Sequence, residues 1–139
     1  MAPSPLTYSV HATAHGAGTA EVALADQTMR VDNSWGASGP TGLPGPAELL
    51  AAAFVACLLK NLERASSLMS FTYDHVEMSV TARREDVPPR FVDISYEITI
   101  TTAEAEHRVD LVHKNLRNFG TVFNTLAAAC DVHGRMTKA

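Results

Sequence analysis

PAELLAAAFVACLL, residues 46–59, is the most apolar helix that the sequence predicts. It follows a loop, residues 34–46, with four glycines and three prolines, too many for the interior of a helix or a strand. Pro46 suits a first helical turn because the N–H that it lacks has no partner there, and Glu48 suits the positive end of the helix dipole. We therefore predict a helix that begins near Pro46 and continues to about Ser66.

The two halves of this helix differ in polarity. Up to Leu59 the only polar side chain is that of Glu48, whereas four polar residues follow between positions 60 and 64. A helix that is apolar on every side is buried on every side. The first half is therefore expected to be the central helix of the domain, or to be covered by a partner subunit, with the second half reaching solvent. Cys57 lies in the apolar half, where a cysteine serves either as a small hydrophobe or as a nucleophile.

Strand patterns lie on both sides of the helix. Residues 73–83 and 91–101 alternate between polar and apolar side chains, and Val87-Pro-Pro-Arg90 between them predicts a hairpin turn. Residues 6–31 contain Thr, Val and Tyr, interrupted at residues 16–18 and 26–27, which predicts a hairpin followed by a third strand. The apolar face of the long hairpin needs a cover, and the apolar helix can supply it.

The C-terminal part alternates helix and strand signals. Residues 103–118 carry apolar side chains at helical spacing, and Gly120 ends this amphipathic helix. A short helical segment over residues 121–128 and a last strand around residues 130–136 follow. The sequence thus predicts a single α+β domain over residues 1–139, with antiparallel sheets packed around a long central helix.

Composition and charge exclude several function classes. The formal net charge of -4 leaves no broad basic surface, so we expect no nucleic-acid partner. Residues 1–6 lack the basic and apolar regions of a secretory signal, and the apolar stretch of residues 49–59 is well short of the roughly 18 residues of a membrane span. We expect a cytoplasmic protein with no membrane partner, whose two cysteines stay thiols or cycle catalytically.

No pattern predicts a metal or a cofactor. The 6 histidines show no tight metal-ligand spacing; they are His11, His15, His75, His107, His113 and His133. The Gly/Pro loop lacks the spacing of a phosphate-binding loop, so nucleotide binding is not expected either.

Two segments resemble the OsmC/Ohr family, the osmotically inducible and organic hydroperoxide resistance proteins. Residues Pro46–Cys57 resemble the family's Pro-x-Glu-Leu-Leu…Ala-x-x-Cys signature, and Val122-Phe-Asn-Thr-Leu126 is similar to its C-terminal helix. The resemblance implies an OsmC-like fold and an intertwined homodimer with two thiol sites at the subunit interface. It also implies that the helix thiol attacks a hydroperoxide to form a sulfenic acid, which a second cysteine resolves as a disulfide.

The chain departs from the family at that second cysteine. The resemblance places it at the start of the Val122–Leu126 helix, where this chain has Gly120 and no thiol. Cys130 lies ten positions further on, since 130 minus 120 is 10. It is a candidate resolving thiol only if folding brings its Cα within about 7 Å of that of Cys57, and its alternative role is that of a small buried strand residue.

The family's charged site residues are also altered. The resemblance implies a glutamate at the helix start, where this chain has Ala47; Glu48 beside it is the candidate, with a first-turn acid as its alternative role. It implies an arginine from the N-terminal strands, for which Arg30 is the candidate, although a surface position suits Arg30 better. Lys60 could supply a charge one turn after Cys57, but a lysine there usually extends to solvent.

Three functions remain open on these residues. The first is a thiol redox protein that reduces organic hydroperoxides through Cys57, oriented by Glu48 and Arg30 and resolved by an external thiol or Cys130. The second is a non-catalytic dimer that binds a small hydrophobic ligand at its interface, with Cys57 lining the pocket. The third is a structural dimer without a site.

Overall fold

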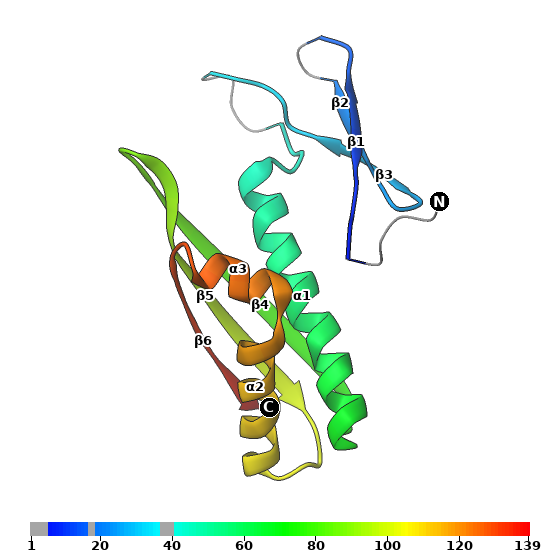
Figure 1. Cartoon of the computed structure of the whole chain (residues 1–139), viewed down its shortest axis with the longest axis vertical. Coiled ribbons are helices and arrows are strands. Elements are labelled where there is room, and N and C mark those ends of the chain that lie inside the picture. The colour runs from blue at the N-terminus through cyan, green and yellow to red at the C-terminus, as the bar shows by residue number, and fades with distance from the viewer. Residues whose placement is uncertain (1–5, 17–18, 37–40) are drawn as a thin grey trace. The chain divides into compact units, whose positions relative to one another are not determined.

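The structure is a computed structural model that describes residues 6–16, 19–36 and 41–139. The chain divides into two compact units, residues 1–49 and 50–139, and each is described by itself. The sequence prediction of a single domain stays a prediction. Figure 1 shows the elements in order along the chain.

The first unit holds a three-stranded antiparallel sheet. Its strands are β1 (His11–Ala14), β2 (Ala20–Leu24) and β3 (Gln27–Val31), paired in the order β1-β2-β3. This is the predicted hairpin followed by a third strand. All four residues of β1 are exposed, and Ala20 is the one buried residue among the described residues of the three strands. The sheet therefore has almost no core of its own within this chain.

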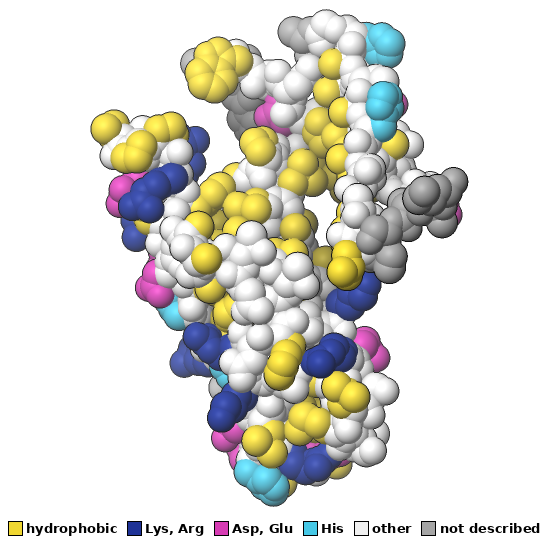
Figure 2. All heavy atoms as spheres, viewed as in Figure 1, with side chains coloured by type: hydrophobic (Ala, Val, Ile, Leu, Met, Phe, Trp, Pro, Cys, Tyr) yellow, Lys and Arg dark blue, Asp and Glu magenta, His cyan; other side chains and the backbone are white. Residues whose placement is uncertain are grey.

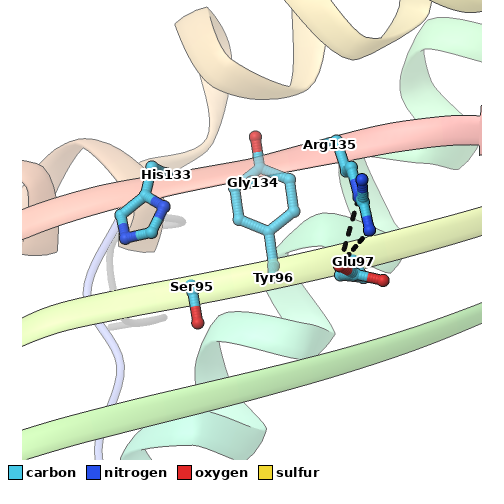
Figure 3. A pocket seen from close by; sticks show the side chains of 6 residues that line it. All are labelled: Ser95, Tyr96, Glu97, His133, Gly134 and Arg135. Atoms are coloured by element: carbon cyan, nitrogen blue, oxygen red, sulfur yellow. Dashed lines mark hydrogen bonds and ion pairs between the residues drawn. The ribbon is translucent and has the colours of Figure 1, made fainter.

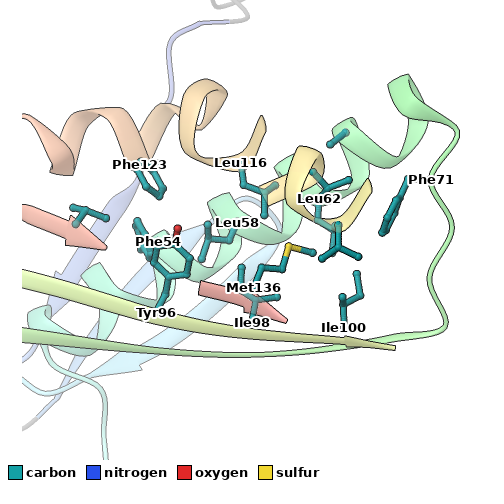
Figure 4. Packing of buried hydrophobic residues seen from close by; sticks show 14 of the residues in the cluster. Phe54, Leu58, Leu62, Phe71, Tyr96, Ile98, Ile100, Leu116, Phe123 and Met136 are labelled. Carbon is teal, nitrogen blue, oxygen red and sulfur yellow. The ribbon is translucent and has the colours of Figure 1, made fainter. Parts of the chain in front are cut away.

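The second unit begins inside α1 (Pro46–Met69) and continues through β4 (His75–Asp86) and β5 (Pro89–Thr101). It then contains α2 (Glu106–Phe119), α3 (Thr121–Ala127) and β6 (Asp131–Lys138). The helices cover one face of the β4-β5-β6 sheet, as the core residues in Figure 4 show. The predicted α+β fold class is confirmed.

One detail of the predicted sheets is wrong. β4 and β5 form the expected antiparallel hairpin, but β5 and β6 pair in parallel, so the sheet is mixed. Parallel neighbours need a crossover long enough to return the chain to the same end of the sheet. α2 and α3 form that crossover. The order of the elements along the sequence does not show whether the strand after two helices runs parallel or antiparallel to its neighbour.

One stripe of α1 builds the core. Phe54, Leu58, Leu62 and Ala65 are buried at helical spacing, and Asn61 is buried beside them. The expectation that the second half of α1 reaches solvent is therefore only partly met, since this stripe continues through it. The opposite side stays exposed in the single chain, at Ala52, Ala53, Ala56 and Leu59.

Tyr96 leaves no room for a side chain at the position of Gly134 on β6. A Cβ atom added at Gly134 would lie 2.4 Å from Tyr96 Cγ and 2.3 Å from the Tyr96 backbone oxygen. The Tyr96 ring thus occupies the space that a side chain on its strand neighbour would need, and it packs among Phe54 and Phe123, with ring centroids 5.9 and 6.0 Å away.

Among the described residues, the structure contains no helix with both the length and the apolar character to cross a membrane.

Candidate functional site

The Cys57 thiol is half-buried on α1 and packs against the core. The buried side chain of Asn61, one turn further along the helix, places its amide Nδ2 3.6 Å from Cys57 Sγ. The same Nδ2 donates a hydrogen bond to the Cys57 backbone oxygen at 2.9 Å, which fixes the orientation of the amide. A fixed N–H donor stabilises negative charge that develops on the sulfur it faces.

Gly120 also lies close to the sulfur and beside the Asn61 amide, since a Cβ atom added at Gly120 would be 3.4 Å from Asn61 Nδ2. It joins α2 to α3 and is buried, and a Cβ atom added there would lie 3.0 Å from Cys57 Sγ. In a cystine, an S–S bond of about 2.04 Å places the Cβ of one residue about 3.0 Å from the sulfur of the other. The backbone at position 120 therefore stands where a disulfide partner of Cys57 would stand, but it carries no side chain.

The second thiol has different surroundings. Cys130 Sγ donates to the backbone oxygen of Leu126 at 3.4 Å, and neither cysteine is in a disulfide. Burial raises the pKa of the Cys130 thiol, and the nearby charges of Asp93 and Asp131 raise it further. A raised pKa lowers the thiolate fraction, which disfavours attack on a sulfenic acid. The role of Cys130 as the resolving thiol stays a prediction without a contact to Cys57 that would support it.

Glu48 is part of the helix start. Its Oε1 accepts a hydrogen bond from the Gly45 backbone N–H at 3.0 Å, and the Leu49 N–H donates to the Gly45 oxygen at 3.0 Å. An acid at the third helical position that reaches back to the residue before the helix is half of a capping box. This contact gives Glu48 a structural role at the helix terminus.

The two basic candidates are exposed. Arg30 lies on β3 opposite Glu21 in the first unit, as the preference for a surface position anticipated. Lys60 is exposed on α1 and donates no hydrogen bond within the described part of the chain. The contacts described around Cys57 Sγ therefore come from the neutral groups of Asn61 and Gly120.

A partly buried polar network that the sequence did not reveal lies on α2 and β5. Tyr96 Oη lies 2.6 Å from His113 Nε2 and accepts a hydrogen bond from Arg117 at 2.9 Å. Burial lowers the pKa of His113, and the Arg117 charge lowers it further; burial raises the pKa of Tyr96, which Arg117 opposes. The Arg117 guanidinium also lies 5.4 Å from the Phe123 ring centroid, and Phe123 Cβ flanks Gly120. This network ties the end of α2, and with it Gly120, to the sheet.

Asn61 is the main site residue that sequence reasoning missed. Its spacing of four from Cys57 was a usable signal, because residues four apart share one helix face. It lies among polar residues at positions 60–64, and those suggested an exposed segment. The structure buries it because the core stripe passes through that position.

The comparisons with known proteins identify one family model and several similar structures. A family model described as OsmC-like protein matches residues 39–133. No protein with a curated description matches the sequence. Among solved structures, an OsmC-like protein from Mycoplasma pneumoniae has a TM-score of 0.85 at 15% identity, covering 98% of this chain and 99% of that chain.

Two structures with hydroperoxide-related descriptions are also similar. The organic hydroperoxide resistance protein OsmC from Legionella pneumophila has a TM-score of 0.69 at 18% identity, covering 95% of this chain and 97% of that one. The organic hydroperoxide resistance protein OhrB of Bacillus subtilis has a TM-score of 0.62 at 19% identity, covering 93% and 98%. At these identities the likeness establishes a shared fold.

Proposed function

Because the chain belongs to the OsmC-like family, we propose that it reduces organic hydroperoxides through Cys57, with an external thiol as the resolving partner. The observation that carries the proposal is that Cys57 Sγ lies next to both the Asn61 amide and the bare backbone of Gly120. The descriptions of the Legionella and Bacillus proteins support the substrate class.

The proposed reaction has three steps. The Cys57 thiolate attacks the terminal oxygen of a hydroperoxide ROOH, the O–O bond breaks, and an alcohol leaves once its alkoxide oxygen takes a proton. The resulting Cys57 sulfenic acid reacts with a first external thiol to give a mixed disulfide and water. A second external thiol then attacks that disulfide, which regenerates the Cys57 thiol and releases an oxidised disulfide.

The residues around the sulfur support these steps. The Asn61 amide donates to Sγ and so stabilises the attacking anion without a formal charge. Gly120 offers no internal thiol where the resemblance expects one, so the resolving sulfur comes from another molecule. The reaction needs a supply of reduced thiols, so we expect the protein to act in the cytoplasm.

We also propose that two chains form an intertwined homodimer. The exposed side of α1 carries Ala52, Ala53, Ala56 and Leu59, with Leu59 41% exposed, and the β1-β2-β3 sheet buries almost none of its side chains. Figure 2 shows apolar side chains at the surface in several places. In an intertwined homodimer, a second copy would bury the exposed apolar side of α1 and side chains of the β1-β2-β3 sheet.

The test follows the oxidation state of Cys57. Purified protein is mixed with a slight excess of cumene hydroperoxide at pH 7, with hydrogen peroxide as the comparison, and mass spectrometry follows sulfenic acid and mixed disulfides over time. We expect oxidation of Cys57 far faster than that of free cysteine, and turnover when a small dithiol is supplied. A thiol as slow as free cysteine would refute the proposal.

Two variants assign the roles. Asn61→Leu keeps roughly the volume but removes the N–H donor, and we expect a loss of about fivefold in the oxidation rate, since one neutral hydrogen bond contributes about 1 kcal/mol. Cys130→Ser is the matched control and should leave both oxidation and turnover unchanged. If Cys130→Ser abolishes turnover, Cys130 and not an external thiol resolves the sulfenic acid.

The alternative function is a non-catalytic dimer that binds a small hydrophobic ligand. The exposed apolar side of α1 favours it, because a groove between two such surfaces would be apolar. A slow Cys57 together with binding of an apolar fluorescent probe that competes with fatty-acid-like ligands would support this function. Fast oxidation of Cys57 without probe binding would exclude it.

A further inference from the structure

The outer face of the β4-β5-β6 sheet is polar. The parallel register of β5 and β6 makes neighbours of Ser95 and His133, and of Glu97 and Arg135. These four side chains, with Tyr96 and Gly134 between them, line an open hollow of about 350 Å³ (Figure 3). Glu97 and Arg135 form an ion pair of 2.8 Å, so at this rung of the ladder the facing charges are opposite.

At the end of the same ladder the facing charges are alike. The register makes Asp93 and Asp131 neighbours, and like charges directly opposite one another destabilise a sheet. Asp131 has no side-chain hydrogen bond or ion pair within the part of the chain that the structure describes. Asp93 is approached by His133, whose Nε2 lies 2.9 Å from Asp93 Oδ1. The imidazole of His133 therefore contacts one of the two carboxylates, that of Asp93.

The three side chains present a set of metal-binding atoms. One imidazole nitrogen and one oxygen from each carboxylate all lie within 4.8 Å of one another. Donors around a tetrahedral zinc ion at about 2.1 Å are about 3.4 Å apart, so donor atoms up to 4.8 Å apart need to approach by at most about 1.4 Å. We propose that Asp93, Asp131 and His133 form a binding site for a zinc-type divalent transition-metal ion.

The donor chemistry selects the class of ion. Imidazole is a ligand for transition metals, whereas magnesium and calcium favour sites built from oxygen ligands. The side chains of His133 and Asp93 are 53% and 26% exposed, so water can complete the coordination. His133 also lines the hollow, which leaves the ion reachable from solvent.

The neighbouring groups do not enter the donor set. Cys130 precedes Asp131, and its Sγ donates to the Leu126 backbone oxygen at 3.4 Å. The site lies outside the contacts of Cys57 and does not depend on the proposed peroxide chemistry.

A bound ion would connect β6 to the rest of the sheet. β6 is the edge strand of the described sheet order β4-β5-β6 and contributes Asp131 and His133, while β5 contributes Asp93. An ion that binds the folded chain and not the unfolded one raises the unfolding temperature. Metal binding and thermal unfolding are thus two independent measurements of the same site.

The experiment titrates zinc chloride into the full-length protein at pH 7 by calorimetry in a buffer that does not bind zinc. We expect one zinc ion per chain, and at least a tenfold weaker affinity in His133→Gln and Asp131→Asn. Both substituted residues, Asp131 and His133, are exposed, so circular dichroism should show unchanged folding of the variants. Zinc should raise the unfolding temperature of the native chain but not that of His133→Gln.

His75 supplies a matched control. It lies on the same sheet face, 3.4 Å from Glu77, but it belongs to no set of three donors among the described residues. His75→Gln should therefore bind zinc as the native chain does, and so should Cys130→Ser and Cys57→Ser. Equal affinity in the native chain and His133→Gln would overturn the proposal, as would a loss that follows His75 or either cysteine.

Discussion

Replacing Gly120 with cysteine should restore an internal partner for Cys57. The introduced Cβ would lie 3.0 Å from Cys57 Sγ, which is about the Cβ-to-sulfur distance across a cystine. The contact with Phe123 Cβ, also 3.0 Å, is tight and requires a shift of a few tenths of an ångström. We therefore expect Gly120→Cys to fold and, on oxidation, to form a disulfide between Cys57 and the introduced thiol.

The magnitude follows from the closed loop and the crowding. A bridge that encloses residues 57–120 restricts the unfolded chain enough to stabilise the fold by about 4 kcal/mol in the chain-entropy model. Crowding at Phe123 costs about 1–3 kcal/mol, as overpacking typically does. The free energy of unfolding of the oxidised variant should thus be about 2 kcal/mol higher than that of the native chain. For a chain of this size, this corresponds to an unfolding temperature about 5–10 °C higher.

The assay counts thiols after one equivalent of cumene hydroperoxide. The native chain has two free cysteines and the variant adds one, so the internal disulfide lowers the count from three to one. Peptide mapping should find Cys57 joined to the thiol introduced at position 120, and Cys57→Ser in the same background should prevent the bridge. A folded variant that keeps three thiols, or that pairs Cys130 instead, would refute the geometric reasoning.

Three further predictions concern stability. Gly134→Ala should destabilise the chain by about 2–4 kcal/mol in urea unfolding, because its Cβ would overlap the Tyr96 ring; an unchanged midpoint would show that the ring moves freely. Glu48→Ala should lower the free energy of unfolding by about 1 kcal/mol, because the hydrogen bond from the Gly45 N–H is lost. Glu48→Gln keeps an acceptor and should preserve stability. If Glu48→Gln slows the oxidation of Cys57, the carboxylate acts in the reaction. Burial lowers the pKa of His113 below its ordinary 6.5, so the unfolded state binds a proton at a higher pH than the folded state does. The free energy of unfolding should therefore fall as the pH drops below about 6.5. His113→Gln should make this pH dependence weaker.

Local signals were sufficient for the helices and the long hairpin. The Gly/Pro loop, Pro46 and the apolar run mark where α1 begins, and strict alternation marks β4 and β5. The end of α1 was less well marked: the helix continues to Met69 and not to about Ser66, because no proline or glycine stops it earlier. The parallel direction of β6 depends on how α2 and α3 cross the sheet, which no local pattern encodes.

The candidate site divides in the same way. Cys57 and Gly120 were identified from two short segments similar to one family, and the structure places their atoms side by side. The donor that faces the sulfur, Asn61, was hidden in a polar run because burial of a single helical position is set by what packs on that side of the helix. His133 had no metal-ligand spacing along the chain, since its partner Asp93 is 40 residues away.

Most of the elements, the family and the candidate nucleophile could be predicted from the sequence alone, because capping residues, alternation and a motif around Cys57 act over a few neighbouring positions. The surroundings of each candidate group emerge only from the tertiary structure. The Asn61 amide at the sulfur, the empty position at Gly120 and the meeting of Asp93, Asp131 and His133 all depend on strand register and helix packing between residues far apart in the chain. Those contacts are set by burial of the whole core, which no short segment specifies alone.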